Sequence, residues 1–252
     1  VLMDYRRPFL SVVMGLTLFA VASTAMTWCK SMIPYAVGFR HDRLFADLGA
    51  LIFFGVPWTM LQWPPLISVL ALGYSLWFPA MGLAFILVLL SRQSDQRTVV
   101  IVSFFLLWMV GGAFAPYFMP AAGPVFYERI GLGDRFNELI AVIPALYRWE
   151  ADYLWNAFRA HEVVAASGIS AMPSMHVATC AWMIHAARRL APRLLIPSIL
   201  FFVLIWVGSV ALAWHYAIDG FVGSLFAIFS LYIADQYVPL RPLDAADLNT
   251  AA

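Results

Sequence analysis

The amino-acid sequence predicts an all-α membrane protein with six transmembrane helices. Two observations predict this fold class. Of the 252 residues, 63% are hydrophobic and only 12% are charged, and apolar runs of about 20 residues, the length that spans a bilayer, recur along the chain. A soluble domain is about 45–50% apolar and about one quarter charged. The composition therefore excludes a soluble enzyme, a nucleic-acid binder and a linker-rich scaffold.

Five apolar runs are long enough to cross the hydrocarbon core, and we expect each of them to form a helix: Pro8–Cys29, Leu66–Ser91, Thr98–Met119, Leu194–Ala213 and Ala217–Tyr237. A sixth run, Pro173–Leu190, is shorter and more polar, and we expect it to span as well. The first run follows Arg6 and Arg7 without a convincing cleavage site, which favours a membrane helix over a removed signal.

The segment Leu48–Trp63 lies between the first two spans. It is apolar, but Gly55 and Pro57 interrupt it, so it is too short and too broken to cross. We expect an interfacial or re-entrant segment with Trp58 and Trp63 at the level of the lipid headgroups.

The arginines orient these helices. With a cytoplasmic N-terminus, short cytoplasmic segments hold the arginines that the positive-inside rule counts: Arg6, Arg7, Arg92, Arg97, Arg188, Arg189, Arg193 and Arg241. We therefore predict that both termini are cytoplasmic and that residues 120–170 form the large extracytoplasmic piece. Within that piece, apolar residues at helical spacing predict an amphipathic interfacial helix from about Arg135 to His161.

Ionisable side chains inside membrane spans are energetically costly and are functional candidates by default. Three of the few present here converge in the predicted topology. His176 starts the fourth span, His215 lies in the turn between the fifth and sixth spans, and Asp219 follows four residues later. At that spacing Asp219 can accept a hydrogen bond from one nitrogen of His215, which leaves the other nitrogen as a nucleophile or base.

The segment Ser170–His176 is typical of a helix start, with Pro173 near the first turn. Its free N–H groups and the Ser174 hydroxyl form a natural phosphate site. A histidine beside such a site can protonate a leaving oxygen.

Other interpretations remain open. A His–Asp pair four residues apart is most often structural, and Pro-Ser is most often a helix cap. Two histidines and one aspartate can also form a facial triad for iron or zinc. The same residues can relay protons in a transporter, or the chain can be a subunit of a membrane complex. We expect Cys29 and Cys180 to be small buried residues without a disulfide.

Pro173-Ser174-Met-His176 together with His215-Tyr-Ala-Ile-Asp219 resembles the type 2 phosphatidic acid phosphatase (PAP2) superfamily, over about Thr98 to Tyr237. The resemblance implies that His215 is the nucleophile that forms a phosphohistidine, that Asp219 orients it, and that His176 is the general acid and later the base. Ser174 would hold phosphoryl oxygens. The chain would then divide into N-terminal helices (1–97), a catalytic core (98–237) and a cytoplasmic tail (238–252).

The sequence differs from the common lipid-phosphatase pattern of this superfamily in two motifs. The only lysine, Lys30, lies at the end of the first span, so the lysine-containing first motif is absent. Gly208 and Ser209 stand where the third motif usually has Ser-Arg. Phosphate charge would therefore need other donors, and the candidates in the outer piece are Tyr127, Arg129, Arg135 and Arg148.

A branch without those arginines is the inositolphosphotransferase group, which includes inositol phosphorylceramide synthase. The chain is similar to it in Gly123–Tyr127, in Trp214–Asp219 and in Asp47–Gln62. The resemblance implies a lipid phosphotransferase that acts at the outer leaflet with a phospholipid donor and a lipid alcohol or water as acceptor. It implies no metal or other cofactor. The alternative is a plain phosphatase for phosphatidate or polyprenyl phosphates.

Overall fold

The computed structural model describes residues 6–52, 61–164 and 167–238, and every regular element in these residues is helical. The predicted all-α class is therefore confirmed. Lipid offers no partner to backbone N–H and C=O groups, so a spanning segment must satisfy them internally, as a helix does. The predicted tail beyond Val238 lies outside the described residues.

Five helical stretches in the described part of the chain are long and apolar enough to cross a membrane: Phe9–Ala36, Pro64–Leu90, Asp95–Phe118, Pro192–Ala211 and Ala217–Tyr237. They correspond to the five long runs in the sequence, so the protein is a multi-pass membrane protein. The sixth predicted span forms α9 (Met175–Leu190), which has 16 residues. The count of six spans stays a prediction.

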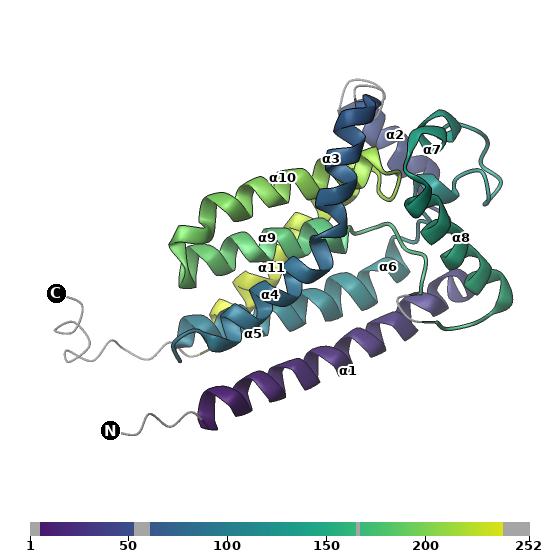
Figure 1. The fold of residues 1–252 in the computed structure, drawn as a ribbon. Helices are drawn as coiled ribbons and strands as arrows, with labels where there is room; N and C mark the ends of the chain where they lie inside the picture. The colour runs from purple at the N-terminus through teal and green to yellow at the C-terminus, as the bar shows by residue number, and fades with distance from the viewer. Residues whose placement is uncertain (1–5, 53–60, 165–166, 239–252) are drawn as a thin grey trace.

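The five stretches are built from the following elements: α1 (Arg6–Ala36), α3 (Pro64–Ser75) with α4 (Trp77–Leu90), α5 (Asp95–Leu106) with the π-helical η2 (Leu107–Phe114) and α6 (Ala115–Phe118), η4 (Pro192–Leu194) with α10 (Leu195–Ala211), and α11 (Ala217–Tyr237). Figure 1 shows α4, α5, α9, α10 and α11 lying side by side, with α1 along one edge. The short helices α2 (Asp42–Ile52), α7 (Asn137–Val142) and α8 (Ala145–Ala160) gather at one end of the bundle.

Helix α9 is the centre of the bundle. It packs against α4, α5, α10 and α11, and its buried residues include Thr179 and Cys180. Because other helices surround α9, its polar residues avoid lipid. This enclosure explains why a sequence too polar for a lipid-facing helix is tolerated here.

The predicted amphipathic helix from Arg135 to His161 is wrong as a single element. Ile143 has an extended backbone (ψ 149°) and Pro144 caps the next helix, so the segment forms α7 and α8 instead. The proline ring clashes with a helical conformation of the preceding residue, and this clash ends α7.

The predicted interfacial segment Leu48–Trp63 is described only at its two ends. Its first residues continue α2, which already starts at Asp42, and Trp63 is exposed. Residues 53–60, with Trp58, lie outside the described residues.

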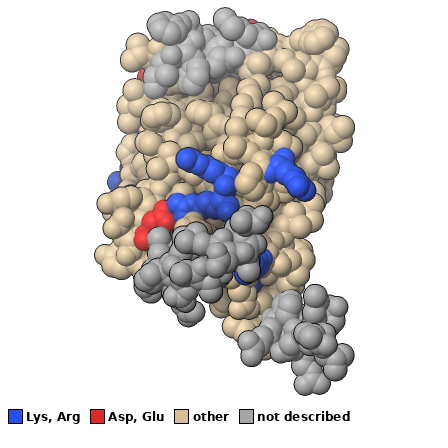
Figure 2. Space-filling view, turned by 90° about the vertical axis from the view of Figure 1, so that its left-hand side faces the viewer, with Lys and Arg blue, Asp and Glu red and all other residues tan. Residues whose placement is uncertain are grey.

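The end of the bundle opposite α2, α7 and α8 carries basic side chains. Arg92, Arg188 and Arg193 are exposed there, and Figure 2 shows Lys and Arg side chains gathered on this face, with acidic side chains beside them. Arg189 is half-buried and donates two hydrogen bonds to Asp235, at 2.7 and 2.5 Å.

Candidate active site

The start of α9 is held by its own serine. Ser174 is the N-cap, and its Oγ accepts a hydrogen bond from the N–H of Val177 at 3.4 Å. The structural interpretation of Pro-Ser as a helix cap is therefore correct. The Ser174 hydroxyl proton is still free to be donated, and the first N–H groups of α9 lack intrahelical acceptors, as at any helix start.

The start of α11 is bound directly to the start of α9. The N–H of Ser174 donates to the backbone carbonyl of Asp219 at 3.1 Å. Gly223 permits this approach, because a Cβ at that position would lie 2.5 Å from the Ser174 carbonyl oxygen. Two segments distant in sequence thus share one layer of the structure.

His215 lies just before α11, and its ring has three polar neighbours. Nδ1 is 2.8 Å from the carbonyl oxygen of Ala171 and 3.3 Å from Oδ2 of Asp219, and Nε2 is 3.4 Å from Nδ1 of His176. Both neighbours of Nδ1 are acceptors, so Nδ1 carries the proton and Nε2 keeps its lone pair. The structure therefore brings His176, His215 and Asp219 together.

The reason for the His215–Asp219 contact differs from the one predicted. A spacing of four residues predicts that the two side chains share one face of a helix, but α11 begins only at Ala217, after His215. Asp219 is the third residue of α11 and accepts the N–H of the N-cap Tyr216 at 2.9 Å. The same carboxylate thus caps the helix and orients the histidine that precedes it.

Two aromatic side chains, which the sequence analysis did not single out, hold His176. Tyr74 stacks on its ring with a centroid distance of 4.8 Å, and the Trp77 ring lies at 4.3 Å. Trp77 Nε1 also donates to the backbone carbonyl of His176 at 3.0 Å. These residues flank the bend between α3 and α4. One wall of the site therefore comes from a span whose sequence is almost entirely apolar.

Asp42, at the start of α2, is a second buried carboxylate near His215. It is 1% exposed and accepts hydrogen bonds from the N–H groups of Ala122 and Gly123 and from the hydroxyl of Tyr216. Burial raises the pKa of Asp42, and these three donors oppose that rise. Burial and the neighbouring Asp42 raise the pKa of Tyr216, so its hydroxyl remains the donor. No motif in the sequence singles Asp42 out.

The three arginines predicted to bind phosphate have partners elsewhere. The closest acceptors are Asp152 for Arg129 at 2.6 Å, Asp47 for Arg135 at 2.5 Å and the Ile143 carbonyl for Arg148 at 2.6 Å. In the described residues, none of these arginines hydrogen-bonds to the two histidines or to Asp219. Arg129 and Arg148 line a separate cavity of about 360 Å³. Tyr127 is buried and packs edge-to-face on Phe136 at 5.0 Å.

Lys30 lies closer to the histidines than its sequence position suggested. The loop before α9 packs on it, since a Cβ on Gly168 would lie 2.6 Å from the Lys30 Cβ. The hydroxyl oxygens of Ser31 and Ser167 are 2.9 Å apart and join the same two segments. Lys30 is near enough to His176 for their charges to interact. Within the described residues, its ammonium has no ion pair or hydrogen bond.

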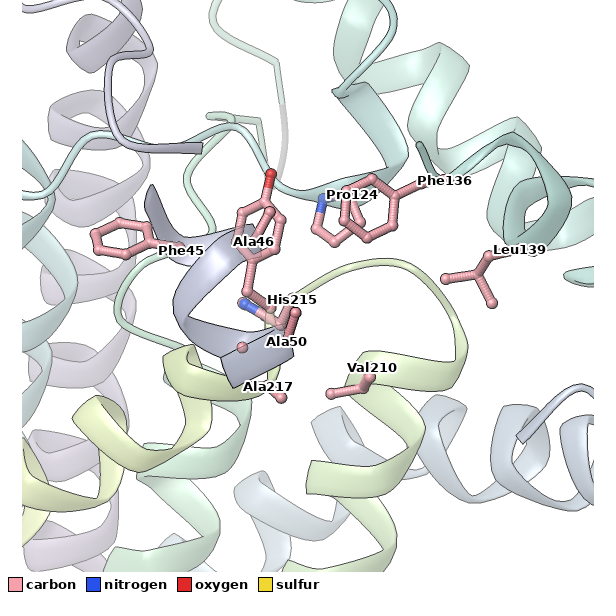
Figure 3. Close-up of a pocket in the computed structure, with 11 residues that line it drawn as sticks. Phe45, Ala46, Ala50, Pro124, Phe136, Leu139, Val210, His215 and Ala217 are labelled. Carbon is pink, nitrogen blue, oxygen red and sulfur yellow. The ribbon is translucent and has the colours of Figure 1, made fainter. Parts of the chain in front are cut away.

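One face of His215 borders a small pocket with a mainly apolar lining, between α2, the outer segment and the start of α11. Figure 3 shows apolar side chains from these elements around His215. The pocket is lined by Phe45, Ala46, Gly49, Ala50, Pro124, Phe136, Leu139, Val210, His215, Tyr216 and Ala217. Its volume is about 10 Å³, room for about one water molecule, so it holds no part of a lipid as it stands.

The metal alternative finds no support in the arrangement of potential ligands. Among the residues that the structure describes, no group of three or more His, Cys, Asp or Glu side chains is arranged to hold a metal ion. Cys29 and Cys180 are both free; Cys180 is buried as expected, whereas Cys29 is only half-buried.

Comparison with known proteins points to one family. A family model described as the PAP2 superfamily matches residues 47–233, more than half of the chain. The match begins well before Thr98, where the resemblance in sequence motifs was expected to start. Comparisons with curated proteins and with solved structures gave no match.

Proposed function

This chain belongs to the PAP2 superfamily, and from that premise we propose that it is a membrane lipid phosphotransferase that works through a phosphohistidine on His215. One observation supports this proposal above all others. Nδ1 of His215 faces two acceptors, and Nε2 faces His176. A nucleophile needs a lone pair directed at the reacting atom and a proton fixed elsewhere on the ring, and this arrangement provides both.

In the proposed first step, Nε2 of His215 attacks the phosphorus of the lipid. The N–P bond forms, the P–O bond to the leaving alcohol breaks, and His176 gives that oxygen its proton. In the second step, His176 removes the proton of an acceptor hydroxyl, whose oxygen attacks phosphorus and breaks the N–P bond. Asp219 stabilises the positive charge that develops on His215 in the first step.

The two imidazole rings must part before the reaction. Nε2 of His215 and Nδ1 of His176 are 3.4 Å apart, a hydrogen-bonding distance that leaves no room for a phosphoryl group between them. His176 is only half-buried, whereas His215 is bonded on its far side to Ala171 and Asp219. We therefore propose that His176 moves when the substrate enters.

Lys30 is the proposed source of positive charge for the phosphate. The three outer arginines already have partners, whereas the Lys30 ammonium has no such partner in the described residues and its charge reaches His176. A cation without an acidic partner, held beside the reacting groups in a low-dielectric site, can stabilise the charge that develops on phosphoryl oxygens. Ser174 and the first N–H groups of α9 would complete the phosphate contacts.

We propose transfer to a lipid alcohol over hydrolysis, as in the inositolphosphotransferase branch. Two segments that carry this resemblance contact each other beside His215. The N–H of Val125 donates to the Ala213 carbonyl at 2.8 Å, and a Cβ on Gly123 would lie 2.7 Å from the Trp214 carbonyl oxygen.

We propose that the site faces the extracytoplasmic side. The start of α9 carries His176, and the last turn of the same helix carries Arg188 and Arg189. The positive-inside rule assigns the arginine end to the cytoplasm, which puts the histidines at the outer leaflet. Fusion of a reporter active only outside the cytoplasm to the outer loop at Asp134, compared with the same fusion at Arg92, tests this orientation.

The central experiment incubates purified protein in lipid nanodiscs with a phospholipid whose phosphate carries ³²P. Parallel reactions contain ceramide, diacylglycerol, an inositol lipid or no added acceptor. A new labelled lipid supports the transferase. Water-soluble label alone supports hydrolysis: free phosphate from a phosphomonoester such as phosphatidate, or the phosphorylated headgroup from a phosphodiester. His215→Ala should abolish turnover and the acid-labile label on the protein. Wild-type turnover by His215→Ala would refute the mechanism.

A further inference from the structure

Asp42 is bonded to two different segments that flank His215. Its Oδ1 accepts the hydroxyl of Tyr216 at 2.7 Å and the N–H of Gly123 at 2.8 Å, and its Oδ2 accepts the N–H of Ala122 at 2.9 Å. The side chain is removed from water. A buried carboxylate with three donors ties its partners firmly, because each donor would otherwise be left unsatisfied.

The first connection runs through Tyr216. This residue directly follows His215 and is the N-cap of α11. Its backbone N–H donates to Asp219 Oδ2, while its hydroxyl reaches back to Asp42. Tyr216 therefore fixes the backbone between His215 and α11 through two groups, its backbone N–H and its side-chain hydroxyl.

The second connection runs through the loop that Asp42 binds. In this loop, Ala121 precedes the two residues that donate to Asp42, and its carbonyl accepts the N–H of Ala171 at 2.8 Å. The Ala171 carbonyl in turn accepts Nδ1 of His215 at 2.8 Å. This bond is shorter than the 3.3 Å contact from Nδ1 to Asp219, so a backbone carbonyl, and not only the carboxylate, sets the orientation of the ring.

We infer that Asp42 is a positioning residue for His215, which acts on the backbone through Tyr216 and on the imidazole ring through the Ala171 carbonyl. This inference rests on the proposed function, in which His215 reacts through Nε2. Asp42 itself touches neither the substrate nor the ring. Its loss would let the ring rotate and the proton move between the two nitrogens, so a smaller fraction of molecules would present a lone pair at Nε2.

The test uses Asp42→Asn and Tyr216→Phe, with Asp47→Asn as the matched control. Asp47 lies on the same helix, but its side chain is 68% exposed. For Asp42→Asn we expect kcat to fall by about 10- to 100-fold while KM changes by less than about twofold. Tyr216→Phe should lower kcat less, and the double variant should be no worse than Asp42→Asn, because both residues act in one network. Asp47→Asn should behave as wild type.

A second readout does not depend on turnover. In protein labelled with ¹⁵N-histidine, nitrogen chemical shifts report which ring nitrogen of His215 carries the proton. We expect Nδ1–H in the wild type and in Asp47→Asn, and a mixture of tautomers in Asp42→Asn. If Asp42→Asn does not fold, Tyr216→Phe takes its place in this measurement.

The two readouts separate the two proposals. A wild-type tautomer and a wild-type kcat per folded molecule in both Asp42→Asn and Tyr216→Phe would overturn the positioning role, even if the thermal midpoint fell. Full activity of His215→Ala would instead refute the proposed function, and a change of tautomer in Asp42→Asn would still support the positioning of the ring.

Discussion

Helices α9 and α11 are joined by polar contacts at both ends, and the two ends differ. At one end, Arg189 donates two hydrogen bonds to Asp235 and a third to Gln96 at 2.9 Å. At the other end, the N–H of Ser174 donates to the Asp219 carbonyl at 3.1 Å, and the Asp219 carboxylate contacts His215, which lies just before α11, at 3.3 Å. In the Arg189–Asp235 ion pair, each oxygen of the carboxylate accepts a hydrogen bond.

The His215–Asp219 contact leaves bonding capacity unused. Asp219 is fully buried, and its Oδ1 has no hydrogen-bond partner in the described part of the chain. Among the residues that the structure describes, Nε2 of His215 contacts only another histidine, His176. A pair whose hydrogen-bonding groups are all used stabilises the fold, whereas a pair with unused donors or acceptors can bind a substrate or accept a proton. We therefore propose that the arginine end stabilises the fold and that the histidine end carries the chemistry, and four substitutions test this division.

The largest expected effect is that of Asp219→Asn. The amide keeps the shape of the side chain but cannot stabilise an imidazolium, so we expect kcat to fall by about 10³- to 10⁴-fold with little change in KM. Single-turnover measurement of the labelled phosphohistidine checks this. A fall of less than about tenfold in kcat would mean that the Ala171 carbonyl alone suffices to orient His215.

Lys30→Gln should have the next largest effect. Removal of the proposed phosphate-binding charge should lower kcat/KM by about 10- to 100-fold and weaken inhibition by vanadate, a phosphate analogue. Lys30→Arg keeps the charge and should retain more activity than Lys30→Gln. Equal kcat/KM values in Lys30→Gln and wild type would place the phosphate charge elsewhere.

Asp235→Asn should act on stability and not on chemistry. Loss of the ion pair with Arg189 should lower the free energy of unfolding by about 1–3 kcal/mol, while kcat per folded molecule stays at the wild-type level. Thermal unfolding in detergent, measured beside Asp219→Asn, gives the contrast. Loss of kcat in Asp235→Asn without loss of stability would contradict the division between the two ends.

Arg129→Gln should have the smallest effect. Its ion pair with Asp152 is partly exposed, at 31% and 57% for the two side chains, and such pairs contribute within about 1 kcal/mol. We expect kcat/KM to change by less than about twofold. A fall of about tenfold or more would restore Arg129 to the phosphate site that the sequence predicted for it.

The sequence predicted the fold class and the meeting of three side chains because both follow from local patterns. Apolar run lengths give the spans, and the start of one span and the turn before another carry His176 and His215. The sequence also indicates the break between α7 and α8 at Pro144, because a proline disfavours a helical conformation in the residue before it.

Lys30 and Asp42 could not be predicted in the same way. The proposed role of Lys30 depends on the packing of the loop around Gly168 on α1. Asp42 is buried and accepts hydrogen bonds from residues 122, 123 and 216, which are distant from it in sequence. A lysine at the end of a span and an aspartate at the start of a short helix are otherwise ordinary surface features.

The shortness of α9 has a consequence for the membrane itself. Sixteen residues make a helix of about 24 Å, against a hydrocarbon core of about 30 Å. In the predicted six-span topology, with Arg188 and Arg189 at one boundary of the hydrocarbon, the first turn of α9 ends about 6 Å below the other boundary. In the proposed reaction, a lipid is therefore drawn inward from its leaflet before its phosphate meets the histidines. Bilayers with shorter acyl chains lower the cost of that displacement, so we expect the rate to rise as the membrane becomes thinner.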